Sequence, residues 1–164
     1  MKRIGTQRDR ESLRARAAHR EFVLYVEDDD DNWTVASLRL GQAYELIRAT
    51  NAEEAYRLLQ QHAANLSAIL MDIELRGSEL NGVELTKLIR GKAAPANGRF
   101  AVPLSAAARS VPIIFVTAHG AKYSDAELHQ AGAEKVIAKP VDFGMLSLAL
   151  TQFHLARPAR GRKR

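Results

Sequence analysis

The feature that most constrains the fold is a fivefold alternation of short apolar runs with segments of helical periodicity. Residues 22–26, Phe-Val-Leu-Tyr-Val, are apolar, β-branched and aromatic, which is typical of a buried strand. Further strands are expected at residues 44–49, 66–71, 111–117 and 135–138. Each of these five runs is followed by a segment that can form a helix.

The expected helices begin at residues that cap helices well. We expect Asp31 and Asn32 to cap the first helix and residues 50–51 to begin the second. The other helices are expected at residues 80–90, 124–132 and 141–155. Strands that alternate with helices form parallel sheets covered on both faces. The sequence therefore predicts an α/β fold, a doubly wound five-stranded parallel sheet with helices on both faces.

Composition excludes several classes of protein. The 164 residues suit one domain with a single core. The absence of cysteine excludes disulfides, thiolate zinc sites and cysteine nucleophiles. No apolar run approaches the ~18 residues that a membrane span needs, and the N-terminus has no signal-peptide core. We therefore expect a cytoplasmic protein that does not enter the membrane.

Positive charge is concentrated at the two ends. Residues 1–20 hold seven Lys and Arg against two acids, and residues 156–164 hold five against none. The remainder holds 17 acids and 12 bases. We expect an acidic folded domain at 21–155, between a poorly ordered basic extension at 1–20 and a basic tail at 156–164. Because no aromatic residue is interleaved with the basic ones, nucleic-acid binding is not expected.

The segment at residues 91–110 is longer than the usual ~2–6 residues between a helix and a strand. Its alanine-rich part, residues 105–109, is a candidate short helix. Otherwise the segment is an extension of the preceding helix, a partner-binding loop or a mobile insertion. The sequence does not decide among these.

Polar side chains stand where four predicted strands end. They are Glu27 and Asp28, Asp72, Thr117, and Lys139. The carboxyl ends of parallel strands share one edge of the sheet, which is where such folds bind ligands. Three carboxylates repel one another unless cations balance them, and oxygen ligands without His or Cys favour Mg²⁺. Residues 29–31 are expected to form the turn and helix cap.

A phosphate would give each of these groups a role. Carboxylates such as Asp72 form aspartyl phosphates. The metal, Lys139 and Thr117 could then neutralise or hydrogen-bond the phosphoryl oxygens. We therefore expect phosphoryl transfer to Asp72.

The set Val-Glu-Asp-Asp at 26–29, Leu-Met-Asp-Ile at 70–73, Phe-Val-Thr-Ala at 115–118 and Ala-Lys-Pro at 138–140 resembles the receiver domain of two-component response regulators. The resemblance covers about residues 22–155 and implies a flavodoxin-like fold. It implies these roles: Asp72 as phosphoacceptor, Glu27 and Asp28 as the acidic pair for Mg²⁺, Glu74 as a metal ligand through its backbone carbonyl, Thr117 as the switch hydroxyl, and Lys139 as the phosphoryl-binding lysine. It also implies a small residue at Ala118, and often a cis bond before Pro140.

The same resemblance implies a protein partner on each side of the signal. A histidine kinase or histidine phosphotransfer protein would donate the phosphoryl group. Because only nine residues follow position 155, output is expected through contacts or phosphotransfer to an unknown protein, with the surface between about 111 and 138 as the expected contact. A phosphorylation-linked homodimer stays open. Val136 stands where the family often has an aromatic residue, so the route from Thr117 to the surface stays open too.

Two other functions remain as alternatives. The first is a small Mg²⁺-dependent phosphatase that uses an aspartyl phosphate. Such hydrolases usually have a second Asp two residues after the nucleophile, where this chain has Glu74. The second is a nucleic-acid adaptor that acts through the basic ends. Under the leading hypothesis the protein is a switch and not an enzyme, apart from its own phosphorylation and dephosphorylation at Asp72.

Overall fold

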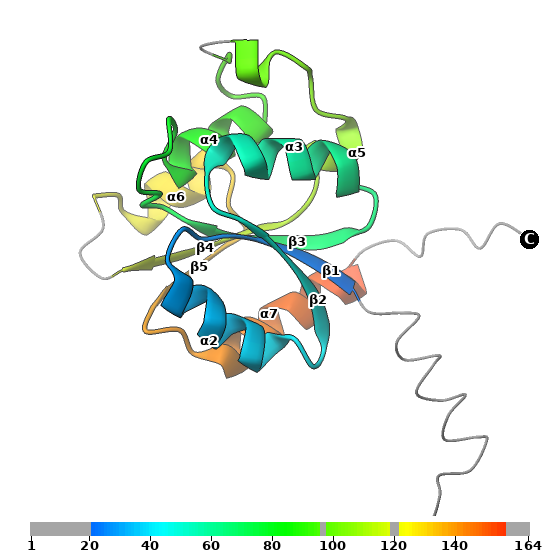
Figure 1. Ribbon diagram of the computed structural model, residues 1–164, viewed down its shortest axis with the longest axis vertical. Coiled ribbons are helices and arrows are strands. Elements are labelled where there is room, and N and C mark those ends of the chain that lie inside the picture. The colour runs from blue at the N-terminus through cyan, green and yellow to red at the C-terminus, as the bar shows by residue number, and fades with distance from the viewer. Residues whose placement is uncertain (1–20, 96–97, 119–121, 157–164) are drawn as a thin grey trace, which may run out of the picture.

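Five parallel strands form the centre of the fold, in the order β2-β1-β3-β4-β5 (Figure 1). The computed structural model describes residues 21–95, 98–118 and 122–156. The strands are β1 (Glu21–Val26), β2 (Tyr44–Ala49), β3 (Leu66–Asp72), β4 (Ile113–Ala118) and β5 (Lys135–Lys139). The chain therefore has the predicted doubly wound parallel sheet.

Helices cover both faces of this sheet, as predicted. On one face lie α3 (Ala52–His62), α4 (Gly82–Ile89), α5 (Ala106–Arg109) and α6 (Asp125–Ala131) (Figure 1). On the other lie α2 (Asp30–Leu40) and α7 (Phe143–Ala156) (Figure 1). None of the helices in these described ranges combines the length and hydropathy that a membrane span requires.

The sheet divides the core into two apolar clusters, and β3 contributes to both. All seven residues of β3 are buried. Successive side chains of a strand point to opposite faces. Accordingly, Ile69 and Met71 join the cluster under α3, α4 and α6, whereas Ala68 and Leu70 join the cluster under α2 and α7. Burial on both faces explains why the sequence of this strand is continuously apolar rather than alternating.

The cap of α2 differs from the prediction. Asp29, not Asp31 or Asn32, is the N-cap, and its carboxylate accepts hydrogen bonds from both of their backbone amides at 3.0 Å. The helix therefore begins two residues earlier than expected. Four successive aspartates can each cap a helix, so the sequence leaves the position undetermined; the chain turns into the helix directly after Asp28.

Helix α4 begins against the main chain of β3. Its N-cap is Asn81, one residue after the expected start at residue 80, and the capping box with Glu84 is complete. The amide of Gly82 donates to the carbonyl of Ile73 at 2.9 Å. A Cβ at position 82 would lie 2.0 Å from the carbonyl oxygen of Asp72. Only glycine permits this approach.

The long segment between α4 and β4 packs onto α3. It contains the 3₁₀ turn η1 (Gly98–Phe100) and α5, which confirms the short helix predicted at residues 105–109. Phe100 is buried and meets the ring of Tyr56 edge to face at 5.3 Å. The Tyr56 hydroxyl donates to the carbonyl of Val102 at 3.0 Å. The described part of this segment is therefore a packed addition to α3, not an extension of α4.

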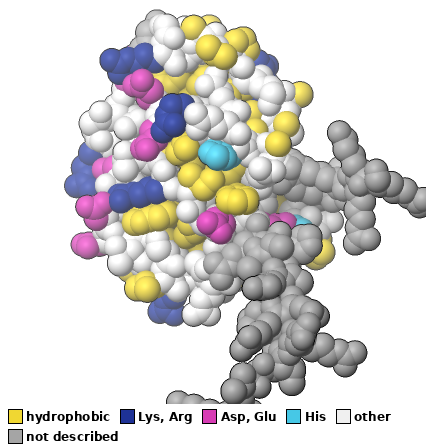
Figure 2. Space-filling model, turned by 45° about the vertical axis from the view of Figure 1, so that its right-hand side comes forward, with side chains coloured by type: hydrophobic (Ala, Val, Ile, Leu, Met, Phe, Trp, Pro, Cys, Tyr) yellow, Lys and Arg dark blue, Asp and Glu magenta, His cyan; other side chains and the backbone are white. Residues whose placement is uncertain are grey.

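Outside the core, the surface carries both signs of charge. On the face drawn in Figure 2, acidic and basic side chains of the described residues are interspersed with apolar ones. This mixture is typical of a globular domain. The basic extension predicted at 1–20 and most of the tail predicted at 156–164 lie outside the described residues.

Candidate functional site

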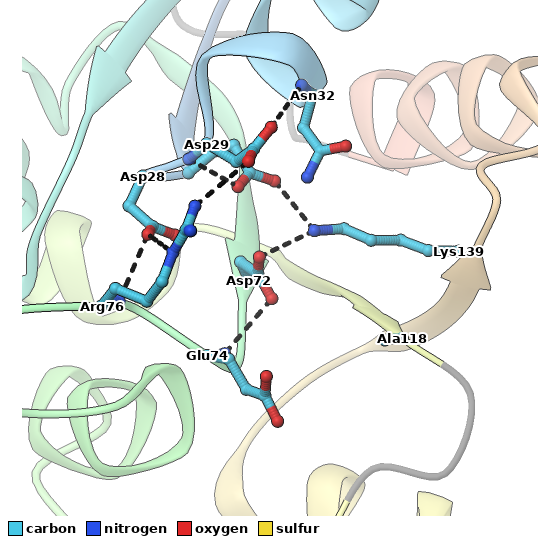
Figure 3. Close-up of a pocket in the computed structure, with 9 residues that line it drawn as sticks. Asp28, Asp29, Asn32, Asp72, Glu74, Arg76, Ala118 and Lys139 are labelled. Carbon is cyan, nitrogen blue, oxygen red and sulfur yellow. Dashed lines mark hydrogen bonds and ion pairs between the residues drawn. The ribbon is translucent and has the colours of Figure 1, made fainter.

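A pocket of about 310 Å³ opens at the carboxyl ends of the strands. It lies where the strand order reverses, between β1 and β3, which is the usual ligand site of a doubly wound sheet. Its lining residues, drawn in Figure 3, are Glu27, Asp28, Asp29, Asn32, Asp72, Glu74, Arg76, Ala118 and Lys139. The strand ends thus bring together the carboxylates and the lysine that were predicted to meet.

Lys139 joins the two innermost carboxylates. Its Nζ lies 2.7 Å from Oδ2 of Asp72 and 3.0 Å from Oε2 of Glu27. Asp72 also accepts a hydrogen bond at Oδ1 from the backbone amide of Glu74, at 3.2 Å (Figure 3). Asp72 is therefore held by donors from β5 and from the loop after β3, and Glu27 shares the donor from β5.

Glu27 is fully buried and its carboxylate is hydrogen-bonded on both oxygens. The hydroxyl of Tyr25 donates to Oε2 and the amide of Asp29 donates to Oε1, each at 3.1 Å. Burial, together with the charge and hydrogen bond of Glu27, raises the pKa of Tyr25 well above its usual value. The Tyr25 phenol therefore stays protonated and donates a hydrogen bond to Glu27 throughout the physiological pH range.

Arg76 closes the outer side of the pocket, and sequence reasoning did not anticipate this. Its Nε lies 2.8 Å from Oδ2 of Asp28, and its Nη2 lies 3.1 Å from Oδ2 of Asp29 (Figure 3). Its backbone amide donates to the same Asp28 oxygen at 3.3 Å. The available signal in the sequence was a basic residue four positions after Asp72.

Arg48 stabilises the turn that follows β1, residues 27–30. Its guanidinium donates to the carbonyls of Glu27 and Asp28, at 3.0 and 3.1 Å, and pairs with Asp30 at 2.7 Å. It also lies over the ring of Trp33, 5.6 Å from the centroid. The only tryptophan of the chain is therefore connected through one side chain to the main chain of the pocket.

Burial and charge act in opposite directions on the central ion pair. Burial raises the pKa of Asp72, and the hydrogen bond and charge of Lys139 oppose that rise. Burial lowers the pKa of Lys139, but its hydrogen bonds with Asp72 and Glu27 outweigh burial, so the net shift is upward. The lysine therefore stays positively charged. Lys139 only partly offsets the effect of burial on Asp72, whose pKa remains above its usual value.

The arrangement of the carboxylates suits a divalent cation. Glu27, Asp28 and Asp72 each offer one oxygen, and these oxygens lie within 4.8 Å of one another. A set of carboxylate oxygens without His or Cys suits a hard cation such as Mg²⁺. The residues present therefore fit the metal that the sequence predicted.

Of the remaining predicted site residues, Glu74 and Ala118 line the pocket and Thr117 does not. Thr117 is buried at the end of β4 and donates a long hydrogen bond of 3.4 Å to the carbonyl of Ala118. The bond between Lys139 and Pro140 is cis, as the resemblance implied.

Fold and pocket together define an α/β domain with a cluster of three carboxylates at the carboxyl edge of its sheet. A family model described as "Response regulator receiver domain" matches residues 23–151. The chain belongs to the family of response regulator receiver domains. It is thus the receiver domain of a two-component system, a signalling switch that depends on phosphorylation.

Curated relatives of similar length support this assignment. The polar-differentiation response regulator DivK of Brucella anthropi is 33% identical over 120 residues, which are 73% of this chain and 84% of that protein. DivK of Brucella ovis is 32% identical over the same coverage.

Solved structures agree on the fold. The receiver domain of the sensor histidine kinase PA1611 from Pseudomonas aeruginosa, with a magnesium ion in its active-site cleft, is 27% identical. It aligns with a TM-score of 0.65 over 82% of this chain and 97% of that chain. The receiver domain of NtrX from Brucella abortus aligns with a TM-score of 0.66 over 82% and 99%, at 20% identity, and so shows the fold alone.

Receiver domains interact with histidine kinases and with output proteins, and they bind Mg²⁺ in their active sites. These comparisons favour neither the phosphatase nor the nucleic-acid adaptor.

Proposed function

We propose that Asp72 is the phosphoacceptor of this receiver domain. The observation that carries the proposal is the position of its carboxylate, at the end of the central strand and inside an acidic pocket. Asp72 is the one carboxylate of the Glu27, Asp28 and Asp72 cluster that β3 supplies, and Ala118, which also lines the pocket, has only a small side chain. A phosphoryl group therefore has room beside the carboxylate.

The transfer is a displacement at phosphorus. One carboxylate oxygen of Asp72 forms a bond to phosphorus while the bond from phosphorus to an imidazole nitrogen of the donor breaks. The imidazole keeps the electron pair and takes up a proton from solvent. Asp72 must be ionised to act, and the Lys139 ammonium at 2.7 Å favours that form.

Lys139 has a second role in this proposal. Once the carboxylate of Asp72 becomes an acyl phosphate, its negative charge moves outward onto the phosphoryl oxygens. The ammonium can follow that charge, because a lysine stem has several rotatable bonds. Glu27 then keeps the hydrogen bond from Tyr25 as its inner partner.

Thr117 is proposed as the residue that senses the phosphoryl group. Among the described residues its hydroxyl makes one long hydrogen bond, 3.4 Å to the carbonyl of Ala118, so reorientation costs little. Thr117 also pairs in register with Ala138, the residue before Lys139. A movement of Thr117 would therefore reach the end of β5.

Glu27, Asp28 and Asp72, with the backbone carbonyl of Glu74, are proposed to hold Mg²⁺. When bound, the ion neutralises charge on the phosphoryl oxygens and on the carboxylates around it. The donor is proposed to be a histidine kinase or a histidine phosphotransfer protein. The output protein, a phosphorylation-linked homodimer and a cytoplasmic location remain predictions.

Mass spectrometry tests the proposal directly. The protein is incubated with Mg²⁺ and a small acyl phosphate donor, and one phosphate that is stable in acid and labile in base is expected. Asp72→Asn should carry none, whereas Asp125→Asn, an exposed acid on α6, should be modified like the wild type. A phosphate that persists in Asp72→Asn would contradict the assignment.

A further inference from the structure

The pocket contains two cations, and they differ in how firmly they are fixed. Lys139 is held between two buried or nearly buried carboxylates, and its side chain is 19% exposed. Arg76 is 75% exposed and makes its contacts from the rim. The inner cation thus belongs to the core, while the outer one lies largely in solvent.

Arg76 occupies a carboxylate that the metal would use. Oδ2 of Asp28 accepts from both the side chain and the backbone amide of Arg76. The side chain of Asp28 is 12% exposed, so the guanidinium takes the solvent-facing part of a largely buried ligand. A divalent ion bound to Asp28 would lie within a few ångströms of this positive charge, where like charges repel strongly.

The loop around Arg76 is anchored so that the side chain can leave independently. The hydroxyl of Ser78 accepts from the amide of Ala52 at 3.0 Å and donates to the carbonyl of Leu80 at 2.8 Å. Gly77, between Arg76 and this anchor, has a φ of 69°. The backbone of the loop is therefore fixed on α3, with the Arg76 amide beside Asp28, and rotation of the long arginine side chain withdraws the guanidinium from Oδ2 of Asp28.

We propose that Arg76 is an internal competitor of the divalent cation. In the metal-free protein it supplies part of the positive charge that the pocket needs, and it releases Asp28 when the cation binds. The inference rests on the proposed Mg²⁺ site and adds its regulation. The affinity for Mg²⁺ is then lower than the carboxylates alone would give.

Calorimetric titration with Mg²⁺ tests this without phosphorylation. Arg76→Gln should bind Mg²⁺ about tenfold more tightly than the wild type, because a nearby repelling charge is removed. Arg76→Lys keeps the charge and should stay within about threefold of the wild type. Arg57→Gln, which removes an exposed arginine of α3 outside the pocket, should change nothing. The fluorescence of Trp33 gives a second readout of the same titration.

Each outcome separates the inference from the proposed site. If wild-type protein binds Mg²⁺ and Asp28→Asn does not, the site stands. Tighter binding by Arg76→Gln then supports the competitor role, whereas unchanged or weaker binding overturns it and makes Arg76 a support for Asp28. If neither the wild type nor Arg76→Gln binds Mg²⁺, the site and the competitor role both fail. Thermal unfolding of each variant checks that the exposed loop substitution leaves the domain folded.

Discussion

The ammonium of Lys139 lies 2.7 Å from the carboxylate of Asp72 and joins the end of β5 to the end of β3. No main-chain hydrogen bonds join these two strands, because β4 lies between them. The ion pair is therefore a direct side-chain connection across the carboxyl edge of the sheet, and both of its members belong to the proposed site.

Replacing Lys139 should affect folding as well as signalling. In Lys139→Met, the buried carboxylates of Glu27 and Asp72 lose their shared counter-charge. Removing one partner of a buried ion pair costs about 3–5 kcal/mol, and the partial exposure here places the expectation nearer 2 kcal/mol. Urea denaturation measures this loss. Saturating Mg²⁺ should restore part of it in the variant, and a loss that Mg²⁺ leaves unchanged would argue against a shared electrostatic origin.

Replacing Asp72, the proposed acceptor, should have the opposite effect on stability. Burial raises the pKa of Asp72, so its ionised form is unfavourable in the metal-free fold at neutral pH. Asp72→Asn keeps the shape and removes one of the repelling charges. We expect its melting temperature without metal to rise by a few degrees, which corresponds to roughly 1 kcal/mol. Calorimetry in a chelating buffer measures it, and a lower melting temperature would contradict the charge argument.

Arg90 should be indispensable to the packing opposite the pocket. Its guanidinium donates to the carbonyls of Arg109, Val111 and Gly132 at 2.5–2.9 Å and pairs with both oxygens of Glu134. Arg90→Met leaves these carbonyls without donors and should cost about 2–4 kcal/mol.

Chemical denaturation of Arg90→Met beside Arg57→Met provides the comparison. Arg57 is exposed on α3, and its contact with Glu54 is 3.9 Å long, so that substitution should cost less than about 0.5 kcal/mol. If both variants lose the same free energy of unfolding, the Arg90 contacts do not stabilise the fold more than an exposed arginine does.

The aromatic ring of Phe100 should hold the long segment before β4 on α3. Phe100→Ala removes a buried ring and its contact with Tyr56, and should cost about 3 kcal/mol. Amide hydrogen exchange should become faster in residues 98–109 and in α3 around Tyr56, while β3 stays protected. Tyr56→Phe, which removes only the hydroxyl that bonds to Val102, should cost about 1 kcal/mol.

The N-terminus of α6 should weaken in acid. Hydrogen bonds from the amide and hydroxyl of Ser124 lower the pKa of Glu127. A lowered pKa in the folded state means that this stabilisation is complete above the unfolded pKa and is lost as the pH falls through the folded pKa. Nuclear magnetic resonance titration should place the Glu127 midpoint below the usual value for a glutamate side chain. In Glu127→Gln, the opening of α6 should no longer respond to pH in this range.

The sequence was informative where one pattern had one physical solution. Continuous apolar runs such as residues 66–71 require burial on both faces, so the strands and the layering of the sheet could be predicted. The meeting of Glu27, Asp28, Asp72 and Lys139 followed from the parallel sheet alone. The short helix before β4 was one of the candidates, because Ser105 and three alanines suit a helix, but the sequence did not decide among the alternatives.

Other features depended on geometry that a sequence does not contain. Four aspartates in a row made the cap of α2 ambiguous, and the structure selects Asp29. The contact of Arg76 with Asp28 joins residues 48 positions apart through a loop with no regular structure. Packing of Phe100 on Tyr56 is likewise long-range, and no periodicity within residues 91–110 indicates it.

The absence of a side chain at Gly82 has a mechanical consequence. The main chain of Asp72 and the first turn of α4 meet as hard spheres, since even one methyl carbon would overlap the Asp72 carbonyl oxygen. Nothing compressible lies between them, so a displacement of the Asp72 main chain towards α4 must displace the helix. This contact connects Asp72, the proposed acceptor, directly to the first turn of α4, without passing through Thr117 or Val136.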